Sequence, residues 1–153
     1  MKPHILWMLL SSLAWAPSAH ASITVEQAWV RATVPGQAVA AAYMKIRSSD
    51  KAALVGIRTP VAQKAEIHEM SMSHGVMKMR PLNRLDLPAD RAVELAPGGH
   101  HLMLTDISKP LKEGDEVPLT LIIEREDRTR VQVQVVAPVR GMSNSGAPHG
   151  HMR

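Results

Sequence analysis

Short apolar runs separated by turn-forming residues are the feature that most constrains the fold of this chain. Residues 131–135 alternate apolar and polar side chains with a period of two, as a half-buried strand does. Pro, Gly, Ser and Asp residues interrupt the sequence before a helical period is sustained. This spacing is typical of an antiparallel sandwich or barrel, so we predict an all-β fold. Further strands are expected at 23–30, 39–46, 54–57 and 119–123, and the alanines of 39–46 leave that segment ambiguous with a helix.

The two ends of the chain differ from this central region. Residues 1–21 have the layout of a secretory signal peptide, with Lys2, an apolar run over 5–15 and a small-residue site that ends at Ala21. The apolar run is shorter than the roughly 20 residues that a spanning helix needs, and no later segment is longer. We therefore expect cleavage after Ala21, a soluble periplasmic product, and one domain over 22–140. Residues 141–153 have almost nothing to bury and predict a disordered tail.

The sequence contains no cysteine, which narrows the chemistry available to it. A disulfide framework and every thiolate metal site are excluded, among them the blue-copper electron-transfer site. Nucleic-acid binding is disfavoured because residues 22–153 have one Trp, one Tyr and no Phe to stack on bases, and their charges are scattered. Neither a Gly-x-Ser-x-Gly nor a His-Glu-x-x-His motif occurs, so we do not expect an enzyme.

Histidine and methionine share one face of an expected strand. In the segment 101–104, Leu102 and Leu104 form the natural core face, which places His101 and Met103 together on the opposite face. Two further segments repeat this alternation, with His68 and Met70 opposite Ile67, and with Met77 and Met79 opposite Lys78. A lone exposed His is usually a surface residue and a lone Met is usually core, but three such segments together favour a metal site.

The donor types indicate which metal would bind. Thioethers are soft donors that select Cu(I), whereas imidazole suits either oxidation state of copper. A set of neutral ligands does not compensate a divalent charge, which favours the monovalent ion. Zinc more usually recruits carboxylate or thiolate donors. The residues therefore predict a copper site, occupied mainly by Cu(I).

The spacing of these residues resembles the motif of the periplasmic copper chaperones of the PCu(A)C family. His68 is followed eleven positions later by Met79 and, after the twenty-one residues 80–100, by His101 and Met103. The segments 28–31, 97–104 and 111–115 are also similar to the family. The resemblance implies a cupredoxin-like, antiparallel Greek-key sandwich or barrel and a Cu(I) site formed by the four motif residues. It also implies delivery of copper to the copper-A centre of cytochrome oxidase.

Several residues near this motif have open roles. We interpret His100 as a rim residue after the Gly-Gly turn rather than as a ligand. The additional residues Met70, Met72, His74 and Met77 form either a second layer around the site or an alternative landing point for copper.

The sequence also leaves two alternatives open, one for the role of the tail and one for the existence of a dedicated copper recipient. His149, His151 and Met152 could bind copper, with the histidines accepting Cu(II), or the tail could be only a solubilising end. A periplasmic copper-resistance buffer without a dedicated recipient would have the same folded site as a chaperone, and the sequence does not separate the two functions.

Overall fold

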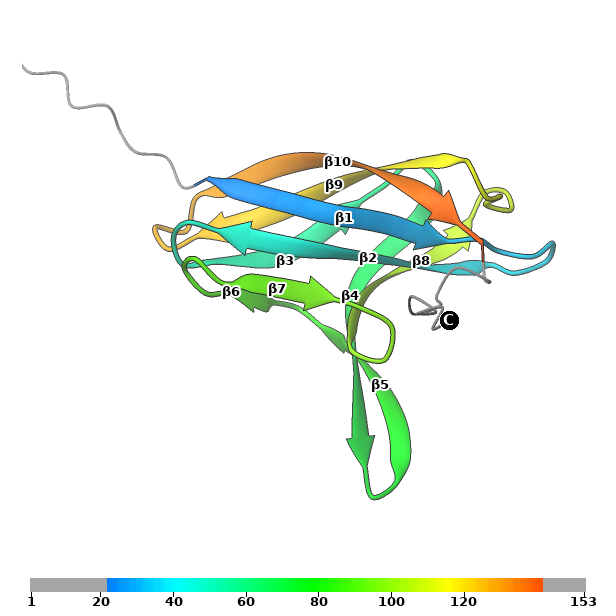
Figure 1. Cartoon of the computed structure of the whole chain (residues 1–153), viewed down its shortest axis with the longest axis horizontal. Helices are drawn as coiled ribbons and strands as arrows, with labels where there is room; N and C mark the ends of the chain where they lie inside the picture. Colours follow the sequence, from blue (N-terminus) through cyan, green and yellow to red (C-terminus); the bar gives the residue numbers. More distant parts are fainter. Residues whose placement is uncertain (1–21, 142–153) are drawn as a thin grey trace, which may run out of the picture.

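The computed structural model describes residues 22–141, and within this range the chain forms ten strands and no helix. Figure 1 shows two layers of strands and one long hairpin that leaves them. The strands are β1 (Ile23–Arg31), β2 (Val39–Ser48), β3 (Ala52–Arg58), β4 (Ala62–Ser73), β5 (Val76–Leu82), β6 (Leu85–Leu87), β7 (Ala92–Leu95), β8 (His100–Ile107), β9 (Glu116–Arg125) and β10 (Arg130–Arg140).

The two layers are joined along one edge by the first and last strands. One layer has the order β5-β4-β8-β2-β1, with β7 paired to the remaining length of β2, and the other has the order β10-β9-β3-β6. The all-β expectation is confirmed, but the sheet is mixed because β1 and β10 pair in parallel at Val30–Val139 and Arg31–Arg140. A parallel pair needs a long crossover connection, and here the whole intervening domain supplies it.

The core lies between the layers and is built from the alternating residues of each strand. On β9 the inward residues Leu119, Leu121 and Ile123 have no exposed surface. The alanine-rich segment that was ambiguous with a helix is the central strand β2, which pairs with β1 on one side and with β7 and β8 on the other. Met44 on β2 is 1% exposed and belongs to this core.

Strand β4 is longer than the layer that it joins. Its residues 62–69 pair with β8, whereas its last residues, 70–73, pair with β5 alone. The β4–β5 hairpin therefore projects from the body of the domain, as Figure 1 shows. Except for Leu82 at its end, every residue of β5 is exposed.

Two of the expected features fall outside the described residues. These are the signal peptide over 1–21 and the tail residues His149, His151 and Met152. Between residues 22 and 141, no helix has the length and apolar character to cross a membrane.

Candidate metal centre

Two histidines from neighbouring strands form the centre of the candidate site. His68 on β4 and His101 on β8 are register partners, and their ring centroids are 5.7 Å apart. Leu102 and Leu104 point into the core, so the histidines lie on the face that the alternation predicts. Both are nevertheless buried, with 9% of His68 and 4% of His101 exposed. The structure thus brings together a pair of largely desolvated imidazoles.

The hydrogen bonds of each ring leave one nitrogen without a partner. Nδ1 of His101 lies 3.3 Å from the carbonyl oxygen of Gly99, which makes it the donor and leaves the Nε2 lone pair available. Nε2 of His68 lies 3.4 Å from Oε2 of Glu66, and Nδ1 of His68 is buried with no hydrogen-bond partner among the described residues. A buried nitrogen without a partner is costly and uncommon. A soft metal ion would satisfy it.

Glu66 determines which ring nitrogen of His68 carries the hydrogen atom. Its carboxylate accepts a hydrogen bond from Lys64 over 3.0 Å, and this bond is the main cause that lowers the pKa of Glu66. The ionised carboxylate then accepts a hydrogen bond from the N–H at Nε2 of His68, so the lone pair stays on Nδ1. This is the carboxylate–histidine arrangement that orients ligands around protein metals.

Burial also favours the neutral form of His101. Desolvation is the main cause that lowers the pKa of His101; repulsion from His68 and His100 adds to it, and the bond to the carbonyl of Gly99 opposes it. The neutral form is the one that coordinates metals. His101 is therefore in its ligand form at neutral pH.

The two motif methionines lie on either side of the histidine pair. Met103 is two residues from His101 on the same face of β8, is half-buried, and is register partner to Glu66. Met79 on β5 is opposite Met70, diagonally across from His68. Diagonal neighbours of this kind are about 7–8 Å apart, within reach of long side chains. Met79 is 47% exposed, so the structure places this residue at the open side of the site.

The other residues with open roles occupy distinct positions. Met70 and Met77 share the face of Met79 on the hairpin, as the register of β4 and β5 requires. His100 is half-buried opposite Glu69, with its Nε2 3.5 Å from Oε1 of that residue, on the face away from His101. His74 lies in the hairpin turn, where its Nδ1 is 3.1 Å from the hydroxyl of Ser73.

An aromatic row next to the histidines was missed by the sequence analysis. Tyr43 on β2 is buried, its ring lies 6.4 Å from that of His101, and the Trp29 ring follows at 4.6 Å. Burial raises the pKa of Tyr43, while Arg31 opposes the rise. The signal was present in the alternation of Tyr43 with Met44, because a core methionine puts its neighbour on the site face.

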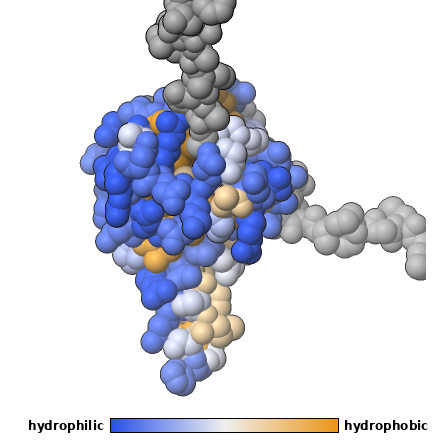
Figure 2. All heavy atoms as spheres, turned by 90° about the vertical axis from the view of Figure 1, so that its left-hand side faces the viewer, coloured by the Kyte–Doolittle hydropathy of each residue, from blue (hydrophilic) through white to orange (hydrophobic). Residues whose placement is uncertain are grey.

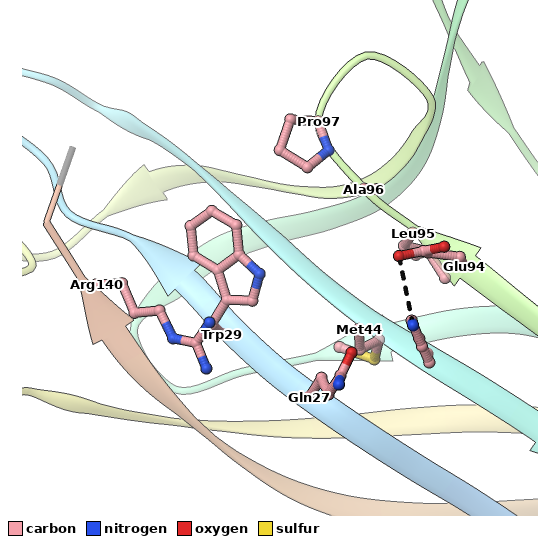
Figure 3. Close-up of a pocket in the computed structure, with 9 residues that line it drawn as sticks. Gln27, Trp29, Met44, Glu94, Leu95, Ala96, Pro97 and Arg140 are labelled. Atoms are coloured by element: carbon pink, nitrogen blue, oxygen red, sulfur yellow. Dashed lines mark ion pairs between the residues drawn. The ribbon is translucent and has the colours of Figure 1, made fainter. Parts of the chain in front are cut away.

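The pocket beside Trp29 is separate from the candidate ligands. It is lined by residues of β1, β2, β7 and β10, and Figure 3 shows Arg140 and Pro97 on either side of the indole ring. An ion pair of 3.8 Å between Lys45 and Glu94 lies at its other end. Neither His68 nor His101 lines this pocket.

Comparison with known proteins identifies a family that the sequence matches. The profile of the family described as "Putative lipoprotein LpqE-like" matches residues 23–135. The "Putative lipoprotein Lxx21020" of Leifsonia xyli subsp. xyli is 30% identical over 128 residues, which cover 82% of this chain and 77% of the relative.

Solved structures show the same fold. The copper-bound PCuAC domain from PmoF2 superposes with a TM-score of 0.62 at 26% identity, over 80% of this chain and 98% of that domain. The solution structure of the Cu(I) form of DR1885 from Deinococcus radiodurans is 32% identical, with a TM-score of 0.53, over 76% of each chain. These matches confirm the resemblance to the PCu(A)C family and the all-β fold expected from it.

Proposed function

The chain belongs to the LpqE-like family and has the fold of the copper-binding PCuAC domains, and from this we propose that it is a carrier of Cu(I) rather than an enzyme. The proposed ligands are His68, Met79, His101 and Met103. The observation that carries the proposal is the buried, unpartnered Nδ1 of His68, in a ring whose centroid lies 5.7 Å from that of His101.

The composition of this ligand set supports the monovalent ion. Two neutral imidazoles and two thioethers bring no negative charge to the metal, and thioethers select soft ions. The nearby carboxylate of Glu66 is already engaged by Lys64 and by His68. Charge and softness together favour Cu(I) over Cu(II) or zinc at the folded site.

The uneven exposure of the ligands suits a protein that releases its ion. The histidines are buried and held by hydrogen bonds, whereas Met79 lies on the exposed strand of a projecting hairpin. A recipient could displace an accessible thioether first and reach the metal without unfolding the domain. We therefore propose that Met79 is the ligand that dissociates from the metal first during transfer.

We further propose that the protein works in the periplasm and that its recipient is the copper-A centre of cytochrome oxidase. The test is to mix the Cu(I)-loaded protein, residues 22–153, with an apo copper-A domain and to measure the copper content of each after separation. We expect copper in the copper-A domain with wild-type protein. Copper that stays on the carrier would contradict delivery and support the alternative, a periplasmic copper-resistance buffer.

Two neighbouring histidines provide matched variants for this test. His101→Ala removes a proposed ligand and should abolish loading, whereas His100→Ala removes an imidazole that pairs with Glu69 on the other face and should leave loading unchanged. Equal loading of the two variants would contradict the assigned site.

A further inference from the structure

The β4–β5 hairpin carries two methionine pairs in line with the histidine pair. Met70 is register partner to Met79, and Met72 is register partner to Met77. Residues directly opposite each other have Cβ atoms about 4.5–5.5 Å apart. Successive pairs on one face of a strand are about 7 Å apart. A row of thioethers therefore runs from the tip of the hairpin toward His68.

Core packing does not explain the outer pair of this row. Met72 is 67% exposed and Met77 is 45% exposed. Except for Val76 at the tip, the other face of the same hairpin is polar, with Ser71 opposite Lys78 and with an ion pair of 2.6 Å between Glu69 and Arg80. Figure 2 shows the apolar band that runs along one side of the projecting hairpin. Exposed apolar surface of this kind marks a site of interaction.

We propose that Met72 and Met77 form an outer site for Cu(I), from which the ion passes by way of Met70 and Met79 to the histidine pair. Opposed thioethers suit a soft monovalent ion. Along the hairpin each step exchanges one sulfur–copper bond for another, and at the histidine pair nitrogen–copper bonds replace sulfur–copper bonds. The ion therefore stays Cu(I), and no electron or proton is transferred. Two thioethers bind more weakly than two imidazoles with two thioethers, so the ion moves inward on loading. The proposal rests on the proposed function.

Ag(I) is a suitable probe because it is a soft monovalent ion that does not change oxidation state. The protein, residues 22–153, would carry ¹³C-labelled methionine methyl groups and be titrated with Ag(I) while NMR spectra are recorded. We expect the first equivalent to shift the methyl signals of Met79 and Met103. Further Ag(I) should then shift those of Met72 and Met77.

A double variant separates the outer site from the inner one. Met72→Leu with Met77→Leu keeps the apolar surface but removes both sulfur atoms, and it should leave the shifts of Met79 and Met103 at the first equivalent unchanged. Transfer of Cu(I) from the protein to a chelator in solution should slow about tenfold, the effect of about 1.4 kcal/mol lost from the transition state. The matched control is Val76→Ala, which changes the exposed apolar tip without removing sulfur.

The outcomes distinguish the two proposals. Methyl signals of Met72 and Met77 that do not move with excess Ag(I), or a double variant that transfers at the wild-type rate, would overturn the outer site. If the methyl signals of Met72 and Met77 shift while those of Met79 and Met103 do not, the outer site would be supported and the inner ligand set contradicted. A Val76→Ala variant as slow as the double variant would attribute the effect to a general disturbance of the hairpin tip and would also overturn the proposal.

Discussion

His68 and His101 acquire their proposed role from the groups that hold them. One is fixed by the carboxylate of Glu66 and the other by the carbonyl of Gly99, and each then offers its second nitrogen. The alternation of leucine with His101 predicted the shared face correctly. It could not predict burial, because Tyr43 approaches from β2 through tertiary packing. The ligand assignment itself stays a prediction.

The lowered pKa of His101 predicts a pH dependence of stability. An unperturbed His titrates near pH 6.5, so on acidification the unfolded chain takes up this proton before the folded protein does. The contribution is complete above about pH 6.5 and is lost as the pH falls toward the lower pKa of the folded state. We expect the free energy of unfolding of the apo protein, measured by urea titrations, to decrease as the pH is lowered from about 6.5.

The control for this dependence is His101→Gln, which cannot titrate at this position. Its free energy of unfolding should decline less steeply over the same pH range. Parallel pH curves for the variant and the wild type would show that His101 is not the group responsible.

Substitutions of Met103 and Met44 are predicted to have opposite effects on Cu(I) affinity and on stability. Met44→Ala removes a side chain with 1% exposure and should cost about 2–5 kcal/mol of stability, with the affinity of the folded protein for Cu(I) little changed. Met103→Ala should weaken Cu(I) binding and cost less stability, because Met103 is half-buried beside the histidines. Chemical denaturation and competition with a Cu(I) chelator measure the two effects. The same pattern in both variants would contradict the assignment of faces.

At the scale of elements, sequence patterns predicted the long strands better than the short ones. The alternation over 131–135 and the apolar run over 119–123 correspond to β10 and β9. Strands β6 and β7 have three and four residues, too few to show a period of two, and were not predicted. The turn of the β4–β5 hairpin lies at His74 and Gly75, which both have positive φ. That β4 continues beyond its sheet depends on where β8 begins, which no local pattern records.

The C-terminal segment remains a prediction at this scale, since residues 142–153 lie outside the described range. We expect His149, His151 and Met152 to capture copper as Cu(II) and to raise its concentration near the folded site. A tethered ligand of this kind acts at an effective concentration near about 1 mM. A variant that ends at Arg140 should keep the Cu(I) site and lose a Cu(II) signal in paramagnetic resonance. Equal Cu(II) stoichiometry and spectra in both chains would make the tail only a solubilising end.

At the scale of the whole molecule, the sheet architecture separates stability from chemistry. The leucines of β8 face the core between the layers, while the proposed ligands His68, Met79, His101 and Met103 share the opposite face of one layer. The resemblance to copper chaperones predicted this all-β domain. The parallel pairing of β1 with β10 could not be predicted from local patterns, because it joins residues more than a hundred positions apart.

The central claim is that this one face binds Cu(I) through two imidazoles and two thioethers. X-ray absorption spectroscopy of the Cu(I)-loaded protein, residues 22–140, tests it most directly, since this chain lacks the tail donors. We expect mixed nitrogen and sulfur ligation, with the sulfur contribution reduced in Met103→Ala and unchanged in Met44→Ala. A shell of nitrogen and oxygen alone would contradict the claim.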